Sequence, residues 1–274
     1  MKQKSIFRAL MALVALGVVF VSCTNADNPY NTTAPDGEYV LVKDSASSST
    51  GDSQISVWEY DAEGRVVKET IDFYYSDGTS DHDVNTFTYS QNLITRETVR
   101  NGVETYSAYF YLNSKGLVES VKDELWDKDC GFEYDDDDRI MVCSESDHRD
   151  SVVWKNGDVE KYIAFGADDK AICFTPSRYE VNFPYVMPYL VYTDTSLTQI
   201  GVFGKTTRHL ISNMHHESEK DGNTAYFNHD YSYVVQNGLV MEFTDDVNEW
   251  YSENGETKDF SRIEHHIFTW KKIK

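Results

Sequence analysis

The histidines are the first residues whose type and spacing could do chemistry. Six of the eight lie in the final third of the chain, where imidazoles from several elements could ligate zinc or copper. These six are His209, His215, His216, His229, His265 and His266. The chain contains no His-Glu-x-x-His motif and no paired Cys-x-x-Cys spacing. We therefore assign no metal site and interpret these histidines as surface or sheet-packing residues.

An acidic segment is the second candidate. Residues 123–150 contain twelve acidic side chains, including the run Asp135–Asp138, whose oxygens could hold calcium. The segment lacks the Asp-x-Asp-x-Asp-Gly loop with a distal Glu, so a charged hairpin tip that blocks edge-to-edge pairing is the favoured interpretation. Carboxylate pairs at glycosidase spacing arise by chance in a chain with 46 acidic residues. We assign no catalytic residue and no cofactor.

Cysteine chemistry centres on Cys130 and Cys143, which are symmetric about the turn at Asp136 and Asp137. A simple hairpin would place the two opposite each other, so a disulfide is a candidate in an oxidising compartment. Buried thiols are the alternative that the spacing leaves open. No Cys/His or Ser/His/Asp arrangement near them indicates a nucleophile.

The segment Gly201-Val-Phe-Gly-Lys-Thr invites comparison with a phosphate-binding loop. That motif needs a glycine five positions before Gly204, and the chain has Gln199 there. We interpret the segment as a tight strand-to-helix turn.

Two serines fit short O-glycosylation motifs. Asp44-Ser45-Ala46 and Asp150-Ser151-Val152 resemble the sites of exported Bacteroidota proteins, and we predict that both lie in loops. The first sits in the Ser-rich stretch 44–53, for which the composition predicts a mobile loop.

The N-terminus predicts export. Three basic residues precede a short apolar run over 9–21, and a small residue stands directly before Cys23, as in the cleavage box of bacterial lipoproteins. We predict a signal peptide over 1–22, lipidation of Cys23, a flexible tether over 23–36 and a single β domain over 37–274. No second hydrophobic span follows, so the lipid anchor is the expected membrane contact.

The body of the chain predicts an all-β, antiparallel up-and-down meander, as a sandwich or barrel. β-rich runs from Val40 to Trp270 alternate with Asn-Gly and Asp-Gly pairs, which suit hairpin turns. A weak repeat of aromatic, polar turn and aliphatic pair starts at Tyr60, Tyr111 and Tyr134, and each unit predicts one hairpin. Leu210, Ile211 and Met214 have helical spacing, which predicts one short helix over 206–220.

The Tyr-Asp-x-x-Gly-Arg hairpins, followed by Gly201–Leu210 and later by Tyr-x-Tyr and Asn-Gly-Leu strands, are similar to a family of Bacteroidota lipoproteins of unknown function. The resemblance covers residues 37–274. It implies a porin-like β fold, a lipid anchor and a place in the cell envelope, as an outer-membrane lipoprotein, periplasmic or surface-exposed. It implies no catalytic residues. A pore is not expected. A lipid-facing barrel wall needs outward apolar side chains at alternate positions, whereas strands such as Arg65–Asp72 carry charged side chains throughout.

Composition limits the partners. The net charge of −21 argues against general affinity for nucleic acid or anionic lipid surfaces. An aromatic content of 14% without catalytic motifs favours a non-catalytic protein that binds a glycan or another envelope protein. The alternative from another class is a divergent polysaccharide hydrolase, which would need a pocket with two convergent carboxylates of shifted pKa.

Overall fold

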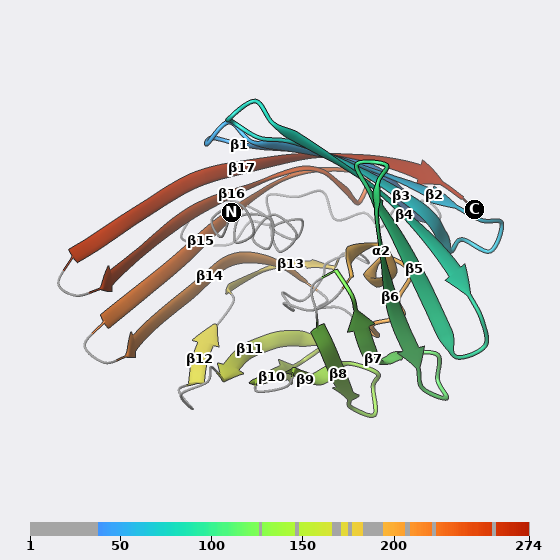
Figure 1. Ribbon diagram of the computed structural model, residues 1–274. Coiled ribbons are helices and arrows are strands. Elements are labelled where there is room, and N and C mark those ends of the chain that lie inside the picture. The colour runs from blue at the N-terminus through green and yellow to red at the C-terminus, as the bar shows by residue number, and fades with distance from the viewer. Residues whose placement is uncertain are drawn as a thin grey trace.

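A computed structural model describes residues 38–125, 128–145, 148–165, 171–174, 177–182, 194–205, 209–220, 223–253 and 256–273. These ranges hold seventeen strands and one short helix, α2 (Figure 1). The strands are Tyr39–Ser48 (β1), Ser53–Tyr60 (β2), Val66–Tyr74 (β3), Ser80–Tyr89 (β4), Leu93–Arg100 (β5), Glu104–Leu112 (β6), Val118–Asp123 (β7), Lys128–Tyr134 (β8), Ile140–Glu145 (β9), His148–Lys155 (β10), Asp158–Phe165 (β11), Ala171–Phe174 (β12), Ser177–Asn182 (β13), His209–Lys220 (β14), Asn223–Gln236 (β15), Leu239–Glu253 (β16) and Glu256–Lys272 (β17). The helix α2 spans Thr195–Thr198.

The strands form one antiparallel meander. Consecutive strands pair with each other from β1 through β12, and again from β13 through β17. β1 also pairs with β17, so strands from the two ends of the domain lie side by side and the sheet curves into a nearly closed barrel (Figure 1). The predicted all-β, antiparallel, barrel-like fold is confirmed.

The predicted hairpin turns have a clear backbone basis. In the Asn-Gly pairs at 101–102, 156–157 and 237–238, both residues have positive φ, as a two-residue type I′ turn requires. At Asp77-Gly78 only the glycine has positive φ, so this turn is of a different type. The pairs at 36–37, 221–222 and 254–255 lie outside the described residues.

The sequence repeat corresponds to a repeated hairpin end. The Asp61 carboxylate accepts hydrogen bonds from the backbone N–H groups of Glu63 and Arg65, and Asp135 and Asn113 cap their own turns in the same way. An aromatic side chain then donates to a backbone carbonyl of a neighbouring hairpin. The donor–acceptor pairs are Tyr60–Leu41, Tyr89–Val66, Tyr134–Val118, Trp154–Ile140 and Trp270–Val240.

A segment of the same chain packs inside the barrel, against the inward-facing side chains of its walls. Residues 194–205, which we call the plug, comprise α2 with its preceding cap and the following turn. Leu197 and Phe203 of the plug are buried in the main apolar core together with inward-facing wall residues such as Trp58 and Phe110. A second, smaller core lies on β14–β17 around Phe243. Along the walls, buried positions alternate with exposed ones, as in β4, where Asp83, Asn85 and Phe87 face inward.

Two local predictions were wrong. The segment 206–220 does not form a helix, because His209–Lys220 is strand β14. Leu210 and Met214 are both buried, and their spacing of four residues suits one face of a strand as well as one face of a helix. Most of the Ser-rich stretch is not a loop either, because residues 44–47 lie in β1 and pair with both β2 and β17, and only residues 49–52 form the turn into β2.

Candidate functional site

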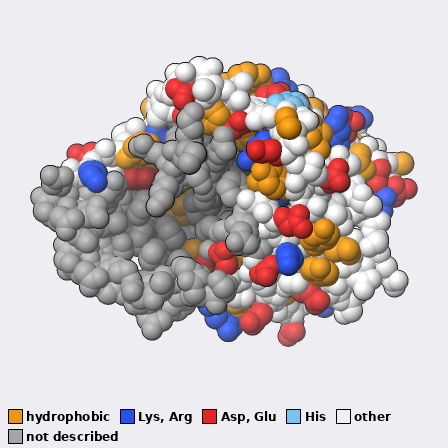
Figure 2. Space-filling view, viewed as in Figure 1, with side chains coloured by type: hydrophobic (Ala, Val, Ile, Leu, Met, Phe, Trp, Pro, Cys, Tyr) orange, Lys and Arg blue, Asp and Glu red, His pale blue; other side chains and the backbone are white. Residues whose placement is uncertain are grey.

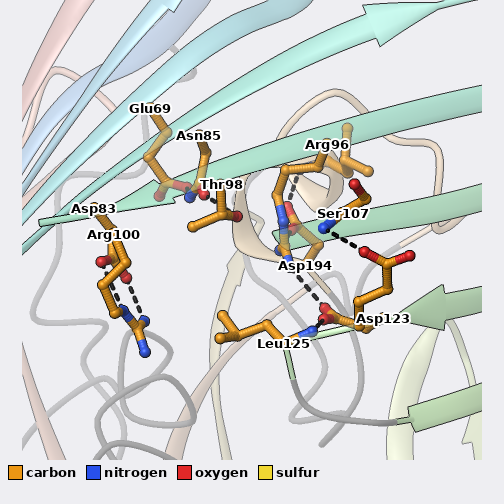
Figure 3. Close-up of polar contacts among 12 residues, drawn as sticks. Glu69, Asp83, Asn85, Arg96, Thr98, Arg100, Ser107, Asp123, Leu125 and Asp194 are labelled. Carbon is orange, nitrogen blue, oxygen red and sulfur yellow. Dashed lines mark hydrogen bonds and ion pairs between the residues drawn. The ribbon is translucent and has the colours of Figure 1, made fainter. Parts of the chain in front are cut away.

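Arg96 is the centre of an inward-facing polar cluster (Figure 3). From β5, its guanidinium donates to Asp194 at 2.5 Å and to Asp123 at 2.6 Å, and thereby joins the plug and β7 to the wall. Burial alone would lower the pKa of Arg96, but the carboxylates of Asp194 and Asp123 raise it above its ordinary value. The guanidinium also lies 5.8 Å from the ring centroid of Phe110. The cluster is therefore a buried, charge-assisted tie between elements distant in sequence.

Glu69 ends a chain of hydrogen bonds across three neighbouring strands. Thr98 on β5 donates to Asn85 at 2.6 Å, and Asn85 on β4 donates to the Glu69 carboxylate on β3 at 2.7 Å (Figure 3). Burial, and next the negative charge of Asp194, raise the pKa of Glu69 to about 7. Glu69 is thus a carboxyl group that can hold or release a proton near neutral pH.

Glu69 and Asp194 are the two neighbouring interior carboxylates against which the hydrolase hypothesis can be examined, and both have other bonds. Asp194 caps the N-terminus of α2 by accepting from the Leu197 N–H at 3.0 Å, while its second oxygen is held by Arg96. Glu69 is 6% exposed and bonded to Asn85. Beside them, Asp83 and Arg100 form a two-pronged ion pair across β4 and β5. These bonds hold the plug and the wall together, and they use most of the polar atoms of the cluster in contacts within the protein.

A second polar cluster lies on the inner face of β1, β15, β16 and β17. His266 bonds Asp44 at 2.8 Å, His229 bonds Asp245 at 3.0 Å and Arg262 bonds Glu264 at 2.5 Å. Burial raises the pKa of Glu264, while Arg262 opposes this shift. The His266 ring stacks on Phe243 with centroids 3.9 Å apart. These inward histidines pack in the sheet, each with a carboxylate partner.

Three further histidines lie apart from this cluster. His209 bonds Asp158 at 2.6 Å, His265 bonds Glu242 at 3.1 Å, and the His215 ring meets Tyr226 edge-on. Within the described ranges, no group of three or more His, Cys, Asp or Glu side chains has an arrangement that could hold a metal ion.

The cysteines are not opposite each other. Cys130 faces Glu145 and Cys143 faces Phe132, because the turn is longer than two residues and a bulge shifts the register next to it. Cys130 and Cys143 are buried thiols in the structure, with no disulfide between them. Diagonal neighbours in a sheet are about 7–8 Å apart, beyond the usual Cα separation of a disulfide. The simple-hairpin geometry behind the predicted bridge is therefore wrong.

The predicted modification sites have different outcomes. Cys23, the signal peptide over 1–22 and the tether lie outside the described residues. Ser45 lies in β1, opposite Ile55 and Ile267, and Ser151 lies in β10, opposite Val142 and Ile163. Neither serine is in a loop as expected, and O-glycosylation of either one stays a prediction.

The segment Gly201–Lys205 follows helix α2 and leads towards strand β14. It is therefore a helix-to-strand connection, and the predicted strand-to-helix turn was wrong. Gly204 has a φ of +82°, and a Cβ there would lie 2.2 Å from the Asp138 carbonyl oxygen. The Lys205 N–H donates to that same carbonyl. The turn is shaped by close packing on the 135–138 hairpin.

The acidic hairpin has a structural use for its charges. Asp135 caps the turn and pairs with Arg139, and Asp138 pairs with Lys115. Asp138 also takes the positive-φ position that Gly64 and Gly116 occupy in the sister hairpins.

Sequence reasoning missed Arg96, Asp194 and Glu69. A usable signal was present in β4, where Asp83 and Asn85 occur at alternate positions on the same face as Phe87. Polar residues in register with an apolar inward residue predict a polar interior.

Comparisons with known proteins support the fold. No family model matches the chain, and no relative was found among curated proteins. A porin-like protein from Bacteroides uniformis ATCC 8492 has a similar structure, with a TM-score of 0.62, 14% identity, and coverage of 84% of this chain and 98% of that one. A porin-like protein from Bacteroides vulgatus ATCC 8482 matches with a TM-score of 0.51 and 14% identity over 85% of this chain and 98% of its own. The chain thus has the fold of these porin-like proteins.

Proposed function

We propose that this protein is a non-catalytic, lipid-anchored protein of the bacterial cell envelope, held at the outer membrane through Cys23, whose β domain binds a glycan or another envelope protein. It would belong to the Bacteroidota lipoprotein family that its hairpins resemble. Among the described residues, no helix is long and apolar enough to cross a membrane.

The observation that carries this proposal is the chemistry of the outer wall. Glu59 pairs with Lys68 at 2.8 Å and Asp72 pairs with His82 at 2.7 Å, across neighbouring strands. All four side chains are between 36% and 60% exposed on the face opposite the core. On the described part of the surface seen in Figure 2, acidic and basic side chains are interspersed with hydrophobic ones. Moving charged side chains into lipid hydrocarbon costs free energy, so such a wall is stable in contact with water. Attachment to a membrane would then need a separate anchor.

The anchor is tested by mass spectrometry of the protein isolated from envelope fractions. We expect a mature chain that begins at Cys23 and carries lipid, whereas Cys23→Ala should lack lipid and leave the membrane fraction. A chain that keeps residues 1–22, or one whose Cys23 is unmodified, would overturn the proposal.

A hydrolase remains the second candidate function, favoured by one observation, the raised pKa of Glu69 beside Asp194. Purified protein should release no reducing sugar from neutral or acidic polysaccharides if the first proposal is right. Release that the wild type shows and Glu69→Gln loses would establish the hydrolase instead.

A further inference from the structure

A hollow of about 480 Å³ opens on the outer face of β6–β9. It is lined by Tyr111, Ser120, Lys122, Asp129, Gly131 and Glu145, among others. Ser120 lies opposite Gly131, and Lys122 lies opposite Asp129, so these residues share one face of the sheet. The positions between them, Val121 and Cys130, are buried on the other face. The hollow exists partly because Gly131 carries no side chain on a face where its neighbours do.

Three of the polar side chains around this hollow, those of Tyr111, Lys122 and Asp129, are uncommitted. Lys122 and Asp129 are directly opposite on β7 and β8, an arrangement that normally favours an ion pair. In the described part of the chain, neither of them, nor Tyr111, makes a side-chain hydrogen bond or ion pair. Elsewhere on the outer wall, as at Glu59 and Lys68, opposite charges across strands do pair. One hollow thus combines an ammonium group, a carboxylate and a phenol, each available to a ligand.

Tyr111 gives the hollow an aromatic rim. It lies on β6 opposite Ser120 of β7, and it is 43% exposed. A tyrosine ring presents an apolar face with a polar tip, so it can pack against the C–H face of a flat ligand and hydrogen-bond at its edge.

We propose that this groove binds a neutral saccharide, with a sugar ring against Tyr111 and sugar hydroxyls bonded to Asp129 and Lys122. A hydroxyl both donates and accepts, so a run of hydroxyls satisfies a carboxylate and an ammonium together, which an apolar partner cannot do. An anionic polymer would be repelled by a chain of net charge −21. The volume lies within the usual range for small-ligand sites, about 300–1,000 Å³. The site rests on the proposed function, of which it names the ligand class and the place.

The test is isothermal titration of the lipid-free chain, residues 24–274, and of the detergent-solubilised full protein. The probes are linear oligosaccharides of glucose, mannose, xylose and galactose, with oligogalacturonate as the acidic comparison. We expect at least one neutral oligosaccharide to bind. Tyr111→Ala and Asp129→Asn should each weaken it roughly tenfold, the effect of losing one well-placed contact.

Two further variants make the test specific. Gly131→Val should fill the hollow and abolish binding. Tyr74→Ala, which removes an equally exposed outer tyrosine of β3 away from the hollow, should bind like the wild type. Circular dichroism and urea unfolding identify any variant that fails to fold, and Asp129→Asn, which changes only a surface group, provides the result if Gly131→Val does not fold.

The proposal is overturned if no neutral oligosaccharide binds, if only oligogalacturonate binds, or if binding is unchanged in Tyr111→Ala and Asp129→Asn. Lipid on Cys23 is measured separately. A lipidated protein that binds no sugar therefore refutes this site and leaves the envelope assignment intact, whereas an unlipidated protein that binds sugar does the reverse.

Discussion

The guanidinium of Arg96 and the carboxylate of Asp194 are 2.5 Å apart and connect the wall of the barrel to the plug inside it. Other polar contacts also join the wall to the plug. Trp58 donates to Ser196 at 2.9 Å, and the Tyr60 hydroxyl lies 2.8 Å from the side-chain amide of Gln199. Farther along, the Phe203 ring lies edge-on to Phe110 and Phe132. The plug is thus held by polar bonds at its start and by aromatic packing at its end.

Arg96→Met is expected to destabilise the protein strongly. It would leave the buried carboxylates of Asp194 and Asp123 without their cation, which typically costs about 3–5 kcal/mol in the free energy of unfolding. Urea unfolding measures this. The triple variant Arg96→Met, Asp123→Asn, Asp194→Asn should recover much of the loss, because no unpaired charge remains and Asn still caps a helix.

Lys68→Met is the matched control, since it removes the cation of an exposed ion pair on the outer wall. It should change the urea midpoint far less than Arg96→Met. Equal effects of the two substitutions would contradict the structural role of Arg96.

Glu69→Gln should change how stability depends on pH. The folded protein holds the Glu69 proton up to about pH 7, whereas the unfolded chain releases it near pH 4.5. The folded state therefore binds more protons between these values, and the free energy of unfolding of the wild type falls as pH rises through that window. Glutamine does not titrate, so the variant should match the wild type near pH 4 and exceed it at pH 8, by at most roughly 3 kcal/mol.

The measurement is urea unfolding at intervals from pH 4 to pH 8. Glu59→Gln, an exposed carboxylate of the outer wall, controls for the loss of one negative charge. A Glu69→Gln difference that stays constant with pH would show that Glu69 does not titrate in this window.

Tyr134→Phe tests the aromatic bonds that link successive hairpins. The Tyr134 hydroxyl donates to the Val118 carbonyl at 2.7 Å, and its loss should lower the free energy of unfolding by about 1 kcal/mol. Tyr111→Phe removes an exposed hydroxyl and should leave thermal unfolding unchanged. If both variants melt like the wild type, the bond contributes nothing measurable.

The sequence predicted the features that depend on neighbouring residues. Asn101-Gly102 and the related pairs form the expected turns, because the preference for positive φ is local. Leu210 and Met214 misled because a spacing of four residues fits two periodicities. Asp44 was assigned to a loop since its Ser-rich surroundings look mobile, yet its partner His266 is 222 residues away. Composition cannot reveal a partner that distant.

The candidate site was hidden for the same reason. Arg96 and Asp194 are 98 residues apart, and only the closure of the barrel around the plug brings them together. The hollow beside Tyr111 depends on register, which places Lys122 opposite Asp129 and Gly131 opposite Ser120. A shift of one residue would turn these side chains to the other face, so their grouping required the structure.

Gly204→Ala should destabilise the contact between the plug and the acidic hairpin. Gly204 has positive φ, and an added Cβ would lie 2.2 Å from the Asp138 carbonyl oxygen, so backbone must move. Gly116→Ala has nearly the same φ with nothing within 4 Å, and it isolates the cost of the backbone conformation alone, about 1 kcal/mol. We expect Gly204→Ala to lower Tm well beyond Gly116→Ala in differential scanning calorimetry. Equal shifts in Tm would mean that the turn relaxes without strain and that the plug is packed more loosely on Asp138 than the distance indicates.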